Sequence, residues 1–204
     1  MSERIRILLA DDQALVRGAL SALLGLETDL EVVAEVGSGD AVVPAVVQHR
    51  PDVALLDVEM PGLDGIAATA AVTKAAPRTR VLIVTTFGRP GYLRRALQAG
   101  ASGFVVKDTP AAQLADAVRR VHAGLRVVDP HLATDSLLAG ESPLTQRETE
   151  VLRAARDGSS VAVIASKLFL SEGTVRNHLS AAIGKTGAAN RTEAVLTAEG
   201  NGWL

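Results

Sequence analysis

The sequence of 204 residues contains no cysteine and very few aromatic residues. Without cysteine, a disulfide framework, a thiol nucleophile and a thiolate zinc site are all excluded. Phenylalanine, tryptophan and tyrosine together make up 2% of the chain, which argues against an aromatic platform for single-stranded nucleic acid. The histidines show neither an HExxH motif nor any paired spacing. They are His49, His122, His131 and His178.

A large excess of charge and a long apolar run are also missing. The 21 basic and 23 acidic residues leave a net charge of −2, which excludes a polybasic protein that coats nucleic acid by charge alone. The longest run without a charged residue, Ala96 to Val106, has 11 residues, and crossing a bilayer takes about 18–20. The N-terminal segment MSERIRILLADD reaches carboxylates too early for a signal peptide. We therefore expect a cytoplasmic protein with no membrane insertion.

The length of the chain suits two compact domains of roughly 100 residues each. Hydrophobic residues make up 48% of the chain and charged residues 22%, so the chain can bury real cores. The residue pattern changes after Gly124 and again at Pro143. We expect one domain over 1–124, a linker over 125–142 with a short helix near 131–139, and a second domain over 143–204.

The first half of the chain alternates five times between a short apolar run and a helical pattern. This alternation predicts an α/β fold with a five-stranded parallel sheet and helices on both faces. Pro44 falls inside the second helical pattern, where it is expected to kink or shorten the helix. The predicted strands are Ile5–Ala10, Glu31–Val36, Val53–Leu56, Val81–Thr85 and Gly103–Val106. The predicted helices cover 14–26, a segment ending near 49, then 65–76, 90–99 and 111–123.

The second domain shows only helical signals, over about 145–157, 161–168, 172–185 and 191–199. Thr145 is followed three residues later by Glu148, the pattern of a capping box at a helix N-terminus. Ser171 is the expected cap of the third helix. The short turn 169–171 between the second and third helices fits a helix-turn-helix.

Polar residues follow four of the predicted strands, and the carboxyl ends of parallel strands meet at one edge of a sheet. Three carboxylates gathered there raise one another's pKa unless a cation lies among them, and Mg²⁺ suits oxygen ligands and phosphate-bearing partners. An aspartate can then carry a phosphoryl group, a lysine can pair with its oxygens, and a threonine hydroxyl can donate to it. The alternative is that these are ordinary polar residues at strand ends with no shared function. The candidate residues of this site are Asp11, Asp12, Asp57, Thr85 and Lys107.

Six sequence motifs resemble a known family. DD at 11–12, LLDVEMPGLDG at 55–65, VTT at 84–86 and FVVKD at 104–108 resemble the receiver domain of bacterial two-component response regulators. LTQRETEVL at 144–152 and SEGTVRNHL at 171–179 resemble the helix-turn-helix of the NarL/FixJ (LuxR-type) group. The resemblance implies a doubly wound, flavodoxin-like receiver domain followed by a four-helix DNA-binding domain. It also implies a regulator of transcription and not an enzyme.

The resemblance implies that Asp57 accepts phosphate from a sensor histidine kinase. Mg²⁺ would bind to Asp12, Asp57 and the main-chain carbonyl of Glu59, with Asp11 as a ligand directly or through water. Lys107 would contact the phosphoryl group.

Two further residues stand at the family's switch positions. Thr85 would swing toward the phosphoryl group, and Phe104 would follow inward, although an aromatic residue in a strand is more simply part of the core. The family often has a cis proline after the lysine, where this chain has Asp108, so the isomer of the Lys107–Asp108 bond is left open.

The predicted helix-turn-helix carries a modest positive charge. Between Pro143 and Arg191 there are seven basic and four acidic residues, which suits duplex DNA gripped by a dimer. The third helix is the expected recognition helix in the major groove of promoter DNA. Arginine reads guanine and asparagine reads adenine; a phosphate contact is the alternative for both Arg176 and Asn177, and an equal one for Arg176. Lys185 and Arg191 are expected to contact phosphate, with solvated surface as the alternative. The candidate DNA contacts are Thr174, Arg176, Asn177, Ser180, Lys185 and Arg191.

Phosphorylation is expected to produce a homodimer through the first and fifth helices of the receiver, because that face pairs receivers in similar proteins. The candidate exposed residues are Val16, Leu20, Leu114, Val118 and Val121.

Alternative functions are a receiver that works without phosphorylation, a small-molecule-sensing LuxR-type receptor, and a phosphatase of the haloacid-dehalogenase type. The phosphatase motif needs a second aspartate, and this chain has Glu59. Within the regulator family, TTFGRPGY at 85–92 and GW at 202–203 are similar to membrane-fluidity regulators that control fatty-acid desaturase genes.

Overall fold

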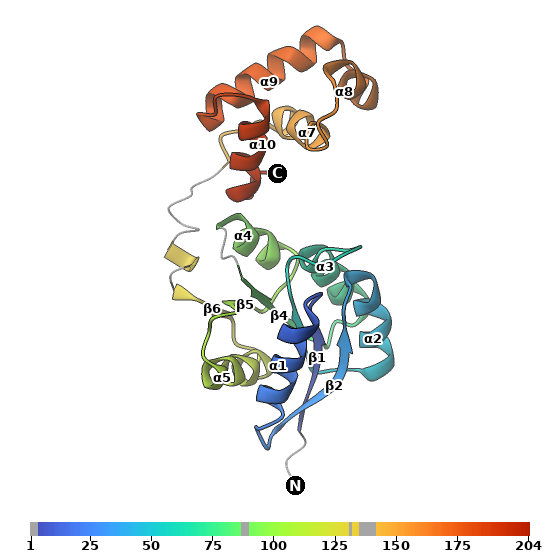
Figure 1. The fold of residues 1–204 in the computed structure, drawn as a ribbon, viewed down its shortest axis with the longest axis vertical. Coiled ribbons are helices and arrows are strands. Elements are labelled where there is room, and N and C mark those ends of the chain that lie inside the picture. Colours follow the sequence, from blue (N-terminus) through green and yellow to red (C-terminus); the bar gives the residue numbers. More distant parts are fainter. Residues whose placement is uncertain (1–3, 87–89, 131, 135–141) are drawn as a thin grey trace. The chain divides into compact units, whose positions relative to one another are not determined.

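The computed structural model describes residues 4–86, 90–130, 132–134 and 142–204. The chain forms two compact units, with the boundary near residue 133, and Figure 1 shows the fold of each. No helix among the described residues is long and apolar enough to cross a membrane.

The first unit is built on a parallel sheet of six strands in the order β2-β1-β3-β4-β5-β6. The register places Leu9 beside Leu55 and Leu55 beside Leu82. Because the strand order reverses between β1 and β3, their carboxyl ends flank the crevice where ligands bind in open α/β sheets. The strands are β1 (Ile5–Ala10), β2 (Leu30–Val36), β3 (Val53–Leu56), β4 (Arg80–Thr85), β5 (Gly103–Val106) and β6 (Val127–Val128).

Helices cover both faces of the sheet, as Figure 1 shows. Alternate residues of each strand face opposite sides: Ile7 and Leu9 pack with α1 and α5, while Leu8 and Ala10 pack with α2 and α3. The central strands are therefore apolar on both faces, as in other buried parallel sheets. The helices of this unit are α1 (Ala14–Leu24), α2 (Val42–His49) after a short 3-10 turn, α3 (Gly65–Ala75), α4 (Pro90–Gln98) and α5 (Ala111–His122).

The structure corrects two expectations for this unit. The sheet has six strands and not five, because Val127 and Val128, expected in a linker, pair with β5; two apolar residues carry no alternation that would reveal a strand. Pro44 does not kink α2, because it is the third residue of the helix, where a backbone N–H has no partner within the helix. Most of the short helix expected near 131–139 lies outside the described residues.

The second unit contains the four expected helices, α7 (Gln146–Ala154), α8 (Val161–Leu168), α9 (Glu172–Thr186) and α10 (Arg191–Gly200). Thr145 and Glu148 form the predicted capping box, and the Ser171 side chain caps α9. The apolar sides of all four helices meet in one core that includes Val151, Ile164 and Val175. This arrangement leaves the opposite side of α9 in solvent.

Candidate functional site

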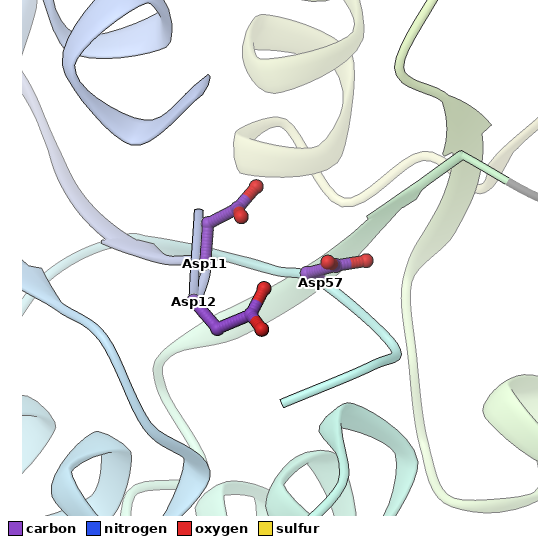
Figure 2. A group of neighbouring side chains, drawn as sticks. All are labelled: Asp11, Asp12 and Asp57. Atoms are coloured by element: carbon purple, nitrogen blue, oxygen red, sulfur yellow. The ribbon is translucent and has the colours of Figure 1, made fainter. Parts of the chain in front are cut away.

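The structure brings Asp11, Asp57 and Lys107 together at the carboxyl edge of the sheet. The Nζ atom of Lys107 lies 2.7 Å from Oδ2 of Asp11 and 2.8 Å from Oδ2 of Asp57. Both aspartates are buried, each with 3% relative exposure, whereas Asp12 is exposed. Figure 2 shows the three aspartates, two following β1 and one following β3.

Backbone hydrogen bonds hold both buried carboxylates in place. Oδ1 of Asp57 accepts from the N–H of Val58 at 2.7 Å, and Oδ1 of Asp11 accepts from the N–H of Gln13 at 2.9 Å. The second oxygen of each carboxylate faces Lys107. These contacts fix the orientation of the groups that a phosphoryl group would meet.

The electrostatics of Asp57 follow from its burial and from its contact with Lys107. Burial raises the pKa of the Asp57 carboxyl above its ordinary value, against the opposing hydrogen bond from Lys107. Burial alone would lower the pKa of Lys107, but its hydrogen bonds to Asp11 and Asp57 raise it. Lys107 is therefore a cation at neutral pH and is available to balance negative charge brought to Asp57.

The donor set fits a magnesium ion. One carboxylate oxygen from each of Asp11, Asp12 and Asp57 lies within 4.8 Å of the others, and Mg²⁺ takes oxygen ligands while keeping several waters. Glu59 has an exposed side chain two residues beyond Asp57. The three aspartates are thus the residues that would hold the ion.

The two expected switch residues lie on adjacent strands. Thr85 ends β4 and is buried, and its carbonyl accepts the N–H of Lys107 at 2.8 Å. The ring of Phe104 is fully buried and belongs to the core on the side of the sheet that α2, α3 and α4 cover, so the inward position is already filled, as expected for a core aromatic. The Lys107–Asp108 bond is trans.

Sequence reasoning missed two supports of the site. Arg17 of α1 donates from Nη1 to the carbonyl of Asp11 at 2.5 Å, and its Nε lies 3.7 Å from Glu35. Gly65 starts α3 so close to the site that a Cβ there would lie 1.8 Å from the carbonyl oxygen of Asp57. The GLDG segment flags that glycine, but no sequence pattern pairs Arg17 with Asp11.

In the second unit, α9 presents a polar exposed side. Arg176, Asn177 and Ser180 are exposed, while Val175 and Leu179 are buried. Nη2 of Arg176 lies 2.7 Å from Glu172, one turn earlier on the helix. Among the expected DNA contacts, these three side chains and that of Lys185 are exposed.

The remaining expected DNA contacts have partners inside the unit. Thr174 is half-buried, with its Oγ1 2.8 Å from the Oγ of Ser171. Lys185 donates to both carboxylate oxygens of the buried Glu148, at 3.0 and 2.8 Å. Arg191 donates to the carbonyls of Ser159 and Gly158 at 2.9 and 3.1 Å. Lys185 is exposed and Arg191 is half-buried, so both stay candidate phosphate contacts, and their partners within the unit are too distant in sequence to predict.

The expected dimer residues fall into two groups, buried residues on α5 and half-buried residues on α1. Leu114, Val118 and Val121 of α5 are buried in the core against the sheet, so naming them as exposed candidates was wrong; the apolar side of α5 faces inward. Val16 and Leu20 are half-buried. The exposed apolar residues nearby belong to α1 and the turn after it, and they are Leu15, Leu23 and Leu26, with relative exposures of 86%, 43% and 78%.

Comparisons with known proteins find a matching protein family for each of the two units. Residues 7–119 match the family model for response regulator receiver domains, and residues 142–198 match that for bacterial regulatory proteins of the luxR family. An uncharacterized transcriptional regulatory protein of Bacillus subtilis, YvfU, is 43% identical over 98% of this chain and 100% of its own. The transcriptional regulatory protein DesR of the same organism is 41% identical, over 98% and 99%.

A solved structure extends the likeness to three dimensions. The response regulator ChrA of a heme-sensing two-component system is 36% identical, with a TM-score of 0.60 over 96% of each chain. The matched relatives cover both units in the same order. The chain therefore belongs to the two-component response regulators that join a receiver domain to a LuxR-type DNA-binding domain and regulate transcription.

Proposed function

We propose that Asp57 is the phosphoacceptor of this regulator and that a sensor histidine kinase supplies the phosphoryl group. The observation that carries this proposal is the position of Lys107, whose Nζ lies between Asp57 and Asp11 in a buried site. In the transfer, an oxygen of the Asp57 carboxylate attacks phosphorus, an acyl phosphate forms, and the bond from phosphorus to the donor histidine nitrogen breaks. The donor keeps the electron pair of that bond.

The other residues of the site bind and orient the group. A magnesium ion would be held by Asp11, Asp12, Asp57 and the main-chain carbonyl of Glu59, and it would supply positive charge to the phosphoryl oxygens. Lys107 exchanges its contact with the Asp57 carboxylate for one with the new phosphoryl oxygens. Thr85, buried at the end of β4, moves toward the phosphoryl group and donates its hydroxyl to it. In this proposal, the inward position of the Phe104 ring on the adjacent strand is coupled to that movement of Thr85.

The output of the regulator is binding to promoter DNA by α9. Arg176 and Asn177 are the proposed base-reading residues, and Ser180 lies on the same exposed side. Since one helix-turn-helix is small, two linked copies gain effective concentration and can raise affinity by roughly 10²–10⁴. The proposed dimer face is α1, through Leu15, Leu23 and Leu26 with the half-buried Val16 and Leu20.

The proposed division of labour assigns phosphorylation to the first unit and DNA binding to residues 143–204. The expected linker over 125–142 starts only after β6, because Val127 and Val128 belong to the sheet. The proposed location is the cytoplasm, because the protein can reach both of its proposed partners, a kinase and the chromosome, in that compartment. The segments TTFGRPGY at 85–92 and GW at 202–203, which are similar to membrane-fluidity regulators, support a proposed role in desaturase gene control. That role predicts that the chain binds upstream of a desaturase gene in its own genome.

The direct test is phosphorylation by acetyl phosphate, followed by intact-mass spectrometry of the full chain. We expect one added phosphoryl group with Mg²⁺, none after chelation, and none in Asp57→Asn, because an amide is not a usable nucleophile. Asp116→Asn, an exposed aspartate of α5, is the matched control and should label normally. Equal labelling of the Asp57 variant would overturn the assignment of Asp57 as the phosphoacceptor. DNA binding that ignores phosphorylation would instead favour a receiver that works without it.

A further inference from the structure

Phe169, in the turn between α8 and α9, is the most exposed large apolar side chain in the described part of the chain. Its relative exposure is 95%, and that of the next, Leu15, is 86%. The backbone of Phe169 is left-handed, with φ of 54° and ψ of 47°, a region that costs free energy for a residue with a Cβ. Glycine or asparagine would make this turn more easily. Neither packing nor backbone preference therefore explains a phenylalanine here.

The turn that carries Phe169 is held firmly on both sides. Arg147 of α7 donates from Nη2 to the carbonyl of Leu168 at 3.2 Å. Leu170 packs against the core of the second unit, and the side chain of Ser171 caps α9. The exposed ring thus projects from a fixed position.

We propose that Phe169 contacts duplex DNA beside the recognition helix, through the apolar groups of the DNA. These groups are the deoxyribose carbons or the methyl group of thymine, which a phenylalanine ring can pack against. The proposal rests on the proposed DNA-binding function of α9. Phe169 lies two residues before Ser171, the N-cap of α9, and the N-terminal residues of a recognition helix are the ones that approach base edges.

The surroundings of the ring favour DNA over a protein partner. Ser171, Glu172 and Gly173, which follow it, are polar or small and exposed. The other large apolar side chains exposed in the described second unit, Val163 and Leu196, belong to α8 and α10. A protein interface has a contiguous apolar centre, whereas a protein–DNA interface is mostly polar with single apolar contacts to bases.

The test compares Phe169→Asn with the wild type in titrations of the full chain. The probes are an operator selected in vitro and a scrambled duplex, each at several salt concentrations. We expect Phe169→Asn to bind the operator about five- to tenfold more weakly, from the apolar area that is no longer buried. The slope of log affinity against log salt should not change, because no charge is lost. The thermal midpoint should be at least that of the wild type, because asparagine tolerates the left-handed backbone.

Two variants control for structure. Phe169→Leu keeps an apolar side chain and should retain most of the affinity. Arg50 ends α2 in the first unit and is the other non-glycine residue with a positive φ, 47°, in the described chain. Arg50→Asn should likewise keep or raise the thermal midpoint, and it should leave operator affinity unchanged.

Thymine-to-uracil substitution in the operator separates the two apolar groups, because uracil lacks the methyl group. A position where uracil weakens binding by wild type but not by Phe169→Asn identifies a thymine methyl contact. If no position behaves in this way, the contact is with deoxyribose.

The proposal is overturned if Phe169→Asn binds as tightly as wild type, or if its affinity and thermal midpoint fall together. It is also overturned if the variant loses only self-association, measured by light scattering. If wild type prefers no duplex and Arg176→Ala changes nothing, the proposed DNA-binding function itself fails.

Discussion

The guanidinium of Arg119 on α5 holds the carboxylate of Asp29 through two hydrogen bonds, 2.8 Å from Nε and 2.7 Å from Nη2. Nη2 also donates to Glu27 at 2.6 Å. The hydrogen bond from Arg119 holds the pKa of the Asp29 carboxyl below its ordinary value. One arginine therefore ties α5 to the turn that follows α1, which places the two helices in a fixed relation.

Arg119→Ala should lower the stability of the first unit slightly but measurably, because a bidentate arginine–carboxylate pair is stronger than an ordinary surface ion pair. Arg120→Ala is the matched control, since Arg120 approaches Asp116 only to 3.9 Å. Urea unfolding of the full chain checks this, with a larger midpoint shift for Arg119→Ala. Equal shifts would show that the bidentate contact adds nothing.

Gly65→Ala should destabilise the chain by about 1–3 kcal/mol and reduce phosphorylation by acetyl phosphate. The added Cβ would lie 1.8 Å from the Asp57 carbonyl, so the backbone carrying the phosphoacceptor must shift. Gly18→Ala is the control, because its Cβ meets nothing within 4 Å in α1. That variant should gain about 0.5–1 kcal/mol from helix propensity. Normal labelling of Gly65→Ala would contradict the prediction.

Leu15→Glu should prevent the phosphorylation-dependent dimer, because it puts a charge in place of the most exposed apolar side chain of α1. Val47→Glu is the control, since Val47 is also exposed, at 57%, but belongs to α2 on the other face of the sheet. Light scattering with a phosphate mimic should show a doubled mass for wild type and Val47→Glu only. A dimer that survives Leu15→Glu would place the interface elsewhere.

The stability of the second unit should depend on pH through Glu148. Burial alone would raise the pKa of Glu148, but hydrogen bonds from Lys185 and Thr145 lower it below the ordinary 4.5. A carboxyl with a lowered folded-state pKa stabilises the fold above its unfolded pKa, and this stability is lost as pH falls through the folded-state value. Glu148→Gln keeps the capping box but loses the ion pair with Lys185.

Thermal midpoints of wild type and Glu148→Gln should therefore differ at pH 7 and converge as the pH falls below about 4.5. Lys185→Met should reproduce the effect, and the double variant should add little to either single one. A difference that stays constant with pH would show that Glu148 acts through packing alone.

The fold was largely predictable because its signals are local. Short apolar runs followed by aspartate or lysine located β1, β3 and β5, and the pattern of Thr145 and Glu148 located the start of α7. The convergence of Asp11, Asp57 and Lys107 followed from the rule that parallel strands end at one edge, and the distances confirm that they lie together.

The contacts that sequence could not supply join residues far apart in the chain. Lys185 is 37 residues from Glu148, and Arg119 is 90 from Asp29, so no periodic pattern links them. The apolar spacing of α1 was visible in the sequence, but spacing alone does not say which side faces water; Leu15 and Leu26 are exposed, while Leu24 is buried. For α5, the expectation that Leu114, Val118 and Val121 are exposed was wrong, because these residues face the sheet.

The sixth strand gives the connection between the units a defined starting point. Val127 and Val128 pair with Gly103 and Phe104, and the N–H of Asp129 donates to the carbonyl of Phe104 at 3.2 Å. The segment leading to the second unit therefore departs from β6, the neighbour of the strand that ends beside Lys107. A displacement of β5 would therefore also displace β6, so the acidic site and the start of the connection depend on one pair of strands.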